Sequence, residues 1–248
     1  MMGARVLVTR PEPGAARTAE RLSAAGCEPV VLPLTKVAPL RQSRPTEEFD
    51  AVAASSANAL RHAYPGLIRL LLEKPFFAVG VETAAAAREA GFVDIRCGQG
   101  SAEDMARDIM LGVRAPASVA YLCGRIRRNV LEAELDREGV RVVPIETYLA
   151  HSRKPSRREL AALDRAPIDA ALAYSSNAAK ALAGLVEPRL GTVFRDTAFI
   201  AISERVAERL RAVAPGRVSS ASSPDEDAMF TLLFRAGHEP ASFSGNHA

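Results

Sequence analysis

The sequence predicts an α/β protein built from two similar open parallel-sheet domains. One observation is that short apolar runs alternate with helical patterns, and a strand, a helix and a second strand within about 30 residues form a βαβ unit. The other is that four such elements recur in the same order about 120 residues later. Chance similarity of generic βα units is the alternative explanation for this recurrence.

The first βαβ unit lies at the N-terminus. Residues 5–9 read Arg-Val-Leu-Val-Thr, which favours a strand, and two prolines follow as breakers. From Ala15, small apolar residues recur every three or four positions until Gly26, which is a good helix stop. Residues 29–32, Pro-Val-Val-Leu, predict the second strand.

The repeat pairs four segments of the chain. Residues 6–34 resemble residues 119–147, with helix stops at Gly26 and Gly139. The other pairs are 50–60 with 169–178, 77–87 with 200–210, and 101–109 with 223–232. In the last pair Ser101 and Ser223 both start a capping-box pattern, and Pro224 would occupy the first helical position of the second one.

The boundary between the halves has two interpretations. A simple division of the repeat falls near Pro116. However, residues 39–48 and 151–158 are polar, charged and contain proline, as linkers do. These two segments are the alternative joints.

Charge and cysteine content limit the function. The 32 Lys and Arg residues against 29 Asp and Glu residues give a net charge of +3, which is too small for a general nucleic-acid binder, so anion binding must be local. Cys27, Cys97 and Cys123 form no CxxC pair, which argues against a disulfide framework or a zinc site. The first 13 residues hold an apolar run too short for a signal peptide or a membrane span, so we expect a cytoplasmic protein without membrane association. Residues 238–248 lack periodicity and predict a disordered tail.

The common catalytic motifs are missing from the sequence. It contains no GxGxxG after a strand, no Walker GxxxxGK, no HExxH and no GxSxG, which weakens dinucleotide, NTP, zinc-protease and α/β-hydrolase interpretations. The four histidines are scattered and none lies near a cysteine, so no metal site is expected.

The recurring feature is a strand that ends in small hydroxyl or glycine residues and leads into a helix. Six turns of this kind contain Thr9-Arg10, Ser55-Ser56-Ala57-Asn58, Gly80 to Thr83, Cys123-Gly124-Arg125, Ser175-Ser176-Asn177 and Ser203. Ligands of open parallel sheets bind at the carboxyl ends of the strands, and free N–H groups at helix N-termini attract carboxylates and phosphates. The alternative for any single position is a helix N-cap, for which Ser, Thr and Asn are preferred. For the set we favour an anion-binding role.

Two arginines and one tyrosine stand out beside these turns. Arg10 and Arg125 occupy what we interpret as equivalent positions of the repeat, and arginine suits a polyacid ligand because it binds carboxylates through paired hydrogen bonds. Tyr148 follows the apolar run 140–145 and precedes the second linker-like segment. Its phenol can donate a proton or a hydrogen bond to a leaving hydroxyl. The alternative for Tyr148 is an amphipathic residue that covers a strand end.

Taken together, the motifs resemble the uroporphyrinogen-III synthase family. The resemblance covers residues 6–234 and lies in the order of the motifs rather than in any single one. The motifs are Val-Leu-Val-Thr-Arg-Pro at residues 6–11, Gly26, residues 31–34, Ser55-Ser56, Gly80 to Ala84, residues 121–124, Gly139 through Tyr148, and Ser175-Ser176-Asn177.

The resemblance implies a particular domain organisation. Residues 1–35 and 152–237 would form one discontinuous domain, and residues 36–151 the other. A two-stranded linker would join them, and the N-terminal unit would complete the C-terminal domain. This arrangement accounts for two joints better than a single boundary at Pro116.

The resemblance also implies a substrate and a reaction. The substrate would be hydroxymethylbilane, a linear tetrapyrrole with eight carboxylates, which loses water and closes into a ring with inversion of ring D. No cofactor is implied, and we expect a monomer that receives substrate by transient hand-over from hydroxymethylbilane synthase. Tyr148 would assist departure of the hydroxyl, and Thr83 would bind substrate or orient a water. Substrate-binding roles would fall to Thr9, Arg10, Ser55, Ser56, Asn58, Gly80, Gly124, Arg125, Ser175, Ser176, Asn177 and Ser203.

One departure from the family pattern bears on activity. Many relatives repeat a Gly-x-x-Thr-Ala turn in both domains, and here Gly80 to Ala84 keeps it whereas residues 203–207 carry Val206 in place of Thr. Two alternatives to the synthase therefore stay open. One is a non-catalytic two-domain binding or regulatory protein for a small polyanionic ligand, and the other is a sugar-phosphate or nucleotide enzyme.

Overall fold

The computed structural model describes residues 3–236, and the predicted tail at 238–248 lies outside them. The chain divides into two compact units. Unit 1 comprises the residues up to Lys36 together with those from His151 onward, and unit 2 comprises Val37–Ala150. Pro116 lies inside unit 2, so a single boundary at that residue is wrong.

Unit 1 contains a five-stranded parallel sheet in the order β11-β10-β9-β1-β2. Its strands are β1 (Arg5–Val8), β2 (Glu28–Val31), β9 (Ala170–Ala173), β10 (Ala198–Ala201) and β11 (Val218–Ser220). Its helices are α1 (Gly14–Ala24), α7 (Arg157–Leu163), α8 (Ser176–Val186), α9 (Glu204–Arg211) and α10 (Glu226–Ala236), with a 3-10 turn at Glu187–Arg189. The N-terminal strand β1 lies between β9 and β2, so the first βαβ unit completes this sheet.

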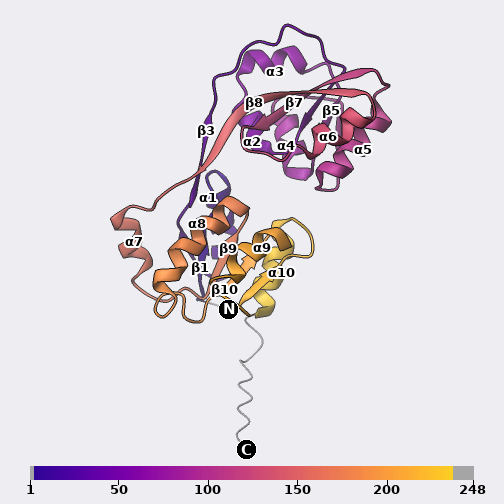
Figure 1. Cartoon of the computed structure of the whole chain (residues 1–248). Helices are drawn as coiled ribbons and strands as arrows, with labels where there is room; N and C mark the ends of the chain where they lie inside the picture. Colours follow the sequence, from indigo (N-terminus) through magenta and orange to yellow (C-terminus); the bar gives the residue numbers. More distant parts are fainter. Residues whose placement is uncertain (1–2, 237–248) are drawn as a thin grey trace, which may run out of the picture. The chain divides into compact units, whose positions relative to one another are not determined.

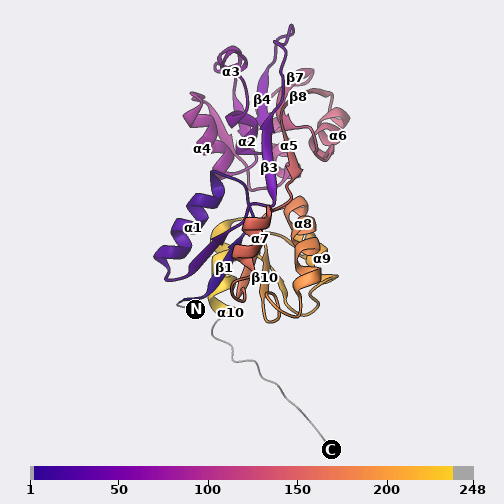
Figure 2. The same cartoon turned by 90° about the vertical axis from the view of Figure 1, so that its left-hand side faces the viewer.

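Helices cover both faces of the unit 1 sheet. Leu22 of α1 and Met229 of α10 pack on Val6 and Val8, on one face. Leu182 of α8 and Leu210 of α9 pack on the opposite face, where the two helices lie side by side (Figure 2). Two separate apolar clusters, one on each face of the sheet, therefore fix the central strands.

Unit 2 repeats this architecture. Its sheet has the order β3-β8-β7-β4-β5-β6, and β8, β7, β4, β5 and β6 run parallel (Figure 1). The strands are β3 (Thr35–Pro39), β4 (Ala51–Ala54), β5 (Phe76–Ala78), β6 (Ile95–Cys97), β7 (Ala117–Gly124) and β8 (Val140–Ser152). The helices are α2 (Ala57–Arg61), α3 (Pro65–Leu71), α4 (Val81–Glu89), α5 (Ala102–Gly112) and α6 (Val130–Arg137). Helices α5 and α6 pack on one face, and α2, α3 and α4 on the other.

Equivalent aspartates anchor the central strand pair of each sheet. Asp50 donates its N–H to the Ser118 carbonyl at 2.8 Å, and its carboxylate accepts the Ser118 N–H at 2.8 Å. Asp169 makes the same two bonds to Arg5, at 3.0 and 2.7 Å. The prediction of two similar parallel-sheet halves is confirmed, and these bonds align the halves residue by residue.

Local predictions also hold at the helix ends. Gly26 and Gly139 have φ angles of +79° and +72°, in the left-handed region that favours glycine, and they follow α1 and α6. Ser101 caps α5 by accepting the Asp104 N–H at 3.0 Å.

The second capping-box prediction is wrong. Helix α10 begins at Glu226, and Asp225 rather than Ser223 accepts the Ala228 N–H, at 2.8 Å. The Ser223 hydroxyl instead donates to Asp225 at 2.5 Å, and Pro224 lies outside the helix.

Half of the second predicted linker, residues 151–158, is regular structure. Strand β8 continues to Ser152, and Ser156 caps α7 in a full capping box with Glu159. The chain passes between the units within β3 and within β8, which are neighbours in the sheet.

Candidate functional site

Each sheet has one pair of neighbouring strands after which the chain continues towards opposite edges of the sheet, and we call the place between these two strands the switch point. In unit 2 this point lies between β4 and β7, since the chain proceeds from β4 towards β5 and from β7 towards β8. In unit 1 it lies between β9 and β1. Open α/β sheets bind ligands at the carboxyl ends of the strands at such a point. Of the predicted residues, Ser55, Ser56, Gly124 and Arg125 lie at the first point, and Thr9, Arg10, Ser175 and Ser176 at the second.

A β-bulge in unit 2 positions Tyr148. Cys123 of β7 pairs with Glu146, but the next residue, Gly124, pairs with Tyr148, so Thr147 is an extra residue in β8. Without the bulge Tyr148 would point to the other side of the sheet, because side chains alternate along a strand. The Arg125 N–H donates to the Tyr148 carbonyl at 2.9 Å and fixes the backbone there.

Gly124 provides the space for the Tyr148 ring. A Cβ atom at position 124 would lie 2.8 Å from Cζ and 3.1 Å from Oη of Tyr148. The ring therefore covers the glycine directly, and its hydroxyl shares a hydrogen bond with Ser56, the N-cap residue of α2. Burial raises the pKa of Tyr148 above its usual value. The hydrogen bond with Ser56 lowers this pKa, but its effect is smaller. The phenol consequently stays protonated at neutral pH and can donate a proton or a hydrogen bond.

A second tyrosine supports the same strand ends. The Tyr121 hydroxyl lies 2.6 Å from the Ser55 hydroxyl, and the Tyr121 side chain is buried on β7. Burial raises the pKa of Tyr121 to about 12. This residue was not among the predicted site residues, and the only signal for it was a tyrosine inside an otherwise apolar strand.

The predicted serines divide between capping and other roles. Ser56 accepts the Asn58 N–H at 3.2 Å, and Ser175 accepts the Ala178 N–H at 3.1 Å, so both are N-caps as the alternative interpretation has it. Ser203 is the N-cap residue of α9 but makes no capping bond with its side chain. The Ser176 hydroxyl oxygen is buried and has no hydrogen-bond partner among the described residues. Asn177 lies next to it on α8, half-buried.

The glycine turn of unit 2 is partly as predicted. Gly80 is the N-cap residue of α4, and a Cβ atom there would approach only the Cα of Gly100, at 3.9 Å, so the fold does not require this glycine. Thr83 is only 3% exposed, on the buried face of α4. Val206 occupies the same helical position in α9 and is 1% exposed. The residue at this position therefore belongs to the buried face of the helix in both units.

Arg10 and Arg125 are not equivalent, contrary to the sequence prediction. The alignment of Asp169–Arg5 with Asp50–Ser118 pairs Arg10 with Cys123, two residues before Arg125. The Arg125 side chain is 55% exposed and bonds Glu146 at 2.9 Å. Arg10 is 17% exposed and bonds Glu226 at 3.1 Å. Thr9 is fully buried, and its hydroxyl donates to the Leu172 carbonyl at 2.6 Å, across the central strand pair.

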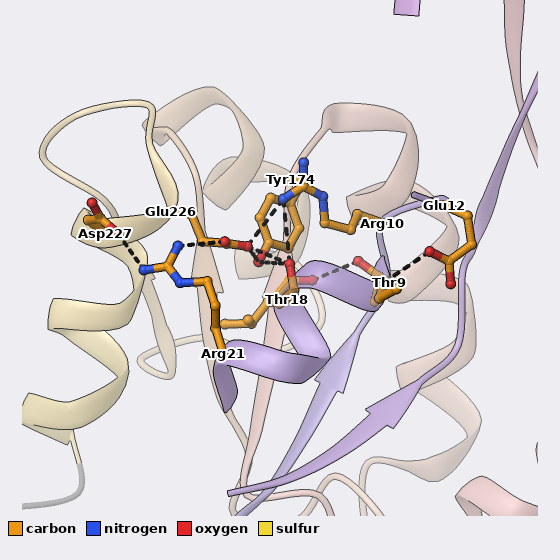
Figure 3. Close-up of polar contacts among 10 residues, drawn as sticks. Thr9, Arg10, Glu12, Thr18, Arg21, Tyr174, Glu226 and Asp227 are labelled. Atoms are coloured by element: carbon orange, nitrogen blue, oxygen red, sulfur yellow. Dashed lines mark hydrogen bonds and ion pairs between the residues drawn. The ribbon is translucent and has the colours of Figure 1, made fainter. Parts of the chain in front are cut away.

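A charged cluster surrounds Arg10 at the second point (Figure 3). The guanidinium lies 4.4 Å from the centre of the Tyr174 ring, and Tyr174 follows β9. Thr18 and Tyr174 both donate to the Glu226 carboxylate, at 2.5 and 2.6 Å. Sequence patterns could not reveal this cluster, because its members come from three segments far apart in the chain.

Within residues 3–236, no group of three or more His, Cys, Asp or Glu side chains is arranged to hold a metal ion. Over the same part of the chain, no helix has the length and apolar character needed to cross a membrane.

Comparisons with known proteins identify relatives of the chain. A stretch of 86 residues is 31% identical to the uroporphyrinogen-III synthase of Saccharomyces cerevisiae, and it covers 32% of this chain and 31% of the yeast protein. The structure resembles uroporphyrinogen-III synthetase from Helicobacter pylori, with a TM-score of 0.68, 18% identity, and coverage of 95% and 100% of the two chains. It also resembles a mutant uroporphyrinogen III synthase from Thermus thermophilus, with a TM-score of 0.54, 16% identity, and coverage of 96% and 100%. At these identities the solved structures establish a common fold.

The family model of uroporphyrinogen-III synthase HemD matches residues 16–231, which include both sheets almost completely. The chain belongs to the uroporphyrinogen-III synthase family.

Proposed function

We propose that this chain catalyses the reaction for which its family is named, the dehydrating cyclisation of hydroxymethylbilane to uroporphyrinogen III with inversion of ring D. The observation that carries the proposal is the protonated Tyr148 phenol, held by the bulge and by Gly124 at the ligand-binding edge of unit 2. The family match does not favour a non-catalytic binding protein.

Tyr148 assists the departure of the hydroxyl group. The C–O bond of the hydroxymethyl group breaks, the phenol donates its proton to the leaving oxygen, and water is released, while the pyrrole N–H proton is lost and restores the phenol. The Ser56 hydroxyl beside the phenol orients it and can return the hydrogen bond. The electrophilic azafulvene that remains is already reactive. The later task of the protein is therefore to hold the bilane so that the substituted pyrrole carbon attacks the azafulvene.

Carboxylate recognition uses the strand ends and the helix N-termini. The half-buried N-terminus of α8, with Ser175 and Ser176, and that of α4, with Gly80, offer N–H groups to acetate and propionate side chains. The open space beside Gly80 lets a ligand approach the backbone closely. Positioning of this kind contributes several kcal/mol to catalysis, on the order of 7–11 in favourable cases.

The remaining proposals concern organisation. We propose domain boundaries at residues 35/36 and 151/152, a monomer that acts in the cytoplasm, and hand-over of substrate from hydroxymethylbilane synthase.

The test is an isomer analysis. Hydroxymethylbilane is generated in situ, the protein is added, the product is oxidised, and uroporphyrins I and III are separated by chromatography. Without the enzyme the bilane closes to type I, so predominantly type III product supports the proposal and type I product alone refutes it. Tyr148→Phe should lower kcat by about 100-fold or more, the usual contribution of a general acid, and change KM little. Tyr64→Phe is the matched control. Tyr64 lies in the same unit, at the N-cap position of α3, and its substitution also removes one phenolic hydroxyl.

A further inference from the structure

The Glu226 carboxylate is bound by four side chains, three from residues 10–21 and one from Tyr174 (Figure 3). Its Oε1 atom accepts hydrogen bonds from Thr18, Tyr174 and Arg10 at 2.5, 2.6 and 3.1 Å. Its Oε2 atom accepts one from Arg21 at 2.7 Å. Glu226 is 16% exposed, so these donors have largely replaced water around it.

The donors form a carboxylate receptor rather than an isolated ion pair. Two guanidinium groups supply charge, and two hydroxyls supply directed hydrogen bonds; hydrogen bonds from guanidinium groups to carboxylates are stronger than those between neutral groups. The Tyr174 ring supports Arg10 from below, at 4.4 Å from the guanidinium carbon. Burial opposes ionisation of Glu226, but the hydrogen bonds from Thr18 and Tyr174 and the charge of Arg10 outweigh it and lower the pKa.

The receptor occupies the ligand-binding edge of unit 1. Arg10 and Tyr174 follow β1 and β9, the two strands between which the chain direction changes. The equivalent positions in unit 2 carry Cys123 and Ser55, so an arginine and a tyrosine at the ends of these two strands are found in unit 1 and not in unit 2. A stabilising ion pair would serve as well anywhere along α1 and α10, whereas a receptor for a substrate carboxylate belongs at this edge.

We infer that Glu226 is an internal competitor: Arg10, Thr18, Arg21 and Tyr174 form a binding site for one carboxylate of the substrate, and Glu226 occupies that site until the substrate displaces it. The inference rests on the proposed function for the identity of the polycarboxylate. Exchange of one carboxylate for another leaves the donors satisfied in both states, so Arg10 and Arg21 keep a charge partner throughout. The alternative is a purely structural bond, because an acidic residue in the first turn also stabilises a helix.

The two explanations predict opposite effects on affinity. When a site is open for only a fraction of the time, the apparent dissociation constant equals the intrinsic constant divided by that fraction, and removal of the competitor restores the full affinity. Glu226→Gln should therefore lower the melting temperature, since Arg10 and Arg21 lose a charged partner, and yet tighten ligand binding by about tenfold if the site is open about a tenth of the time. A structural bond predicts lower stability with affinity unchanged or weakened.

The experiment compares Glu226→Gln with Asp227→Asn in the full chain. Asp227 is the next residue, is 85% exposed and bonds Arg21 only, so its substitution makes the same change in net charge without emptying the receptor. The readouts are the melting temperature, KM for hydroxymethylbilane, and the dissociation constant of uroporphyrin III. Uroporphyrin III carries eight carboxylates, and its binding is followed by porphyrin fluorescence. The variant Arg10→Gln and the double variant with Glu226→Gln complete a cycle.

We expect tighter uroporphyrin binding and lower KM in Glu226→Gln, little change in Asp227→Asn, and loss of the gain when Arg10→Gln is added. Equal effects of the two acidic substitutions would reduce the result to net charge and overturn the inference, as would unchanged or absent uroporphyrin binding in both the parent and Glu226→Gln. Tighter binding by Glu226→Gln in a protein that forms no type III product would leave the receptor standing and refute the proposed function. Type III product with unchanged KM and unchanged uroporphyrin binding in Glu226→Gln would support the proposed function and refute the inference about Glu226.

Discussion

Substitution of Gly124 by alanine tests whether catalysis depends on the exact position of the Tyr148 ring. The added Cβ atom would lie 2.8 Å from Cζ, 3.0 Å from Cε2 and 3.1 Å from Oη of Tyr148. Carbon atoms in contact are ordinarily about 3.5–4.0 Å apart, so the closest pair is about 0.7 Å too near. The Tyr148 backbone is held by the Arg125 N–H and by the strand pairing, so the ring must move instead.

The expected loss of activity follows from this displacement. A shift of about 1 Å in a reacting group costs on the order of 100-fold in rate. We therefore expect Gly124→Ala to lower kcat by about 100-fold with a smaller change in KM, because the phenol acts at the leaving-group step. Overpacking also costs about 1–3 kcal/mol in the free energy of unfolding, which leaves room for a folded variant.

The assay is the rate of type III formation from hydroxymethylbilane, together with urea denaturation of each variant. Gly184→Ala is the matched control, since a Cβ atom there meets nothing within 4 Å and alanine is the better helix residue in α8. A Gly124→Ala protein that retains parental kcat would refute the reasoning, because the ring would then be mobile or irrelevant to the reaction. A Gly124→Ala variant that fails to fold is replaced by Gly124→Ala combined with Tyr148→Ala, which removes the ring atoms that the Cβ would meet. A kcat equal to that of Tyr148→Ala alone then identifies the ring as the only obstacle.

Two further predictions concern stability. Thr147 is fully buried and its hydroxyl has no partner among the described residues, so Thr147→Val should raise the free energy of unfolding by about 1 kcal/mol in urea denaturation; a decrease would mean that the hydroxyl is satisfied. The pKa of Glu226 is lowered in the folded protein, so its ionised carboxylate stabilises the fold. This contribution is complete above the unfolded pKa of ~4.3 and is lost as the pH falls through the lower pKa of the folded protein. The free energy of unfolding should therefore decline less between about pH 6 and pH 3 in Glu226→Gln than in the parent, and identical slopes would contradict this.

The predictable part of the fold was the part encoded locally. The apolar run before α1, the period within it and the glycine after it all lie in one short segment, and β1, α1 and β2 appear there within two residues of the expected bounds. Gly26 and Gly139 could be identified because a left-handed helix stop requires a glycine at that position. The place of the first βαβ unit in the sheet of the C-terminal domain was an implication of the family resemblance.

The errors arose where strand register or distant contacts decide the outcome. Arg10 and Arg125 both follow an apolar strand, which is why the pattern pairs them, but β7 is twice as long as β1 and pairs with β8 through a bulge, which local patterns do not reveal. The Ser223 capping box failed because Asp225 provides a carboxylate acceptor closer to the helix. Glu226 was overlooked as a site residue because its partners lie more than 50 residues away in sequence.

The two units combine one frame with two different kinds of chemistry. The aspartate bonds of Asp50 and Asp169 keep the central strand pair in the same register, so side chains at matching positions can be compared directly. At the carboxyl ends of its central strands, unit 2 places the hydroxyl groups of Ser55, Ser56 and Tyr148, with Tyr148 kept protonated by burial, beside the exposed ion pair of Arg125 with Glu146. At the matching edge, unit 1 places guanidinium groups and a carboxylate. A neutral phenol suits the departure of a hydroxyl and a group of cationic donors suits the binding of a carboxylate, so under the proposed function bond breaking falls to unit 2 and the binding of one substrate carboxylate to unit 1.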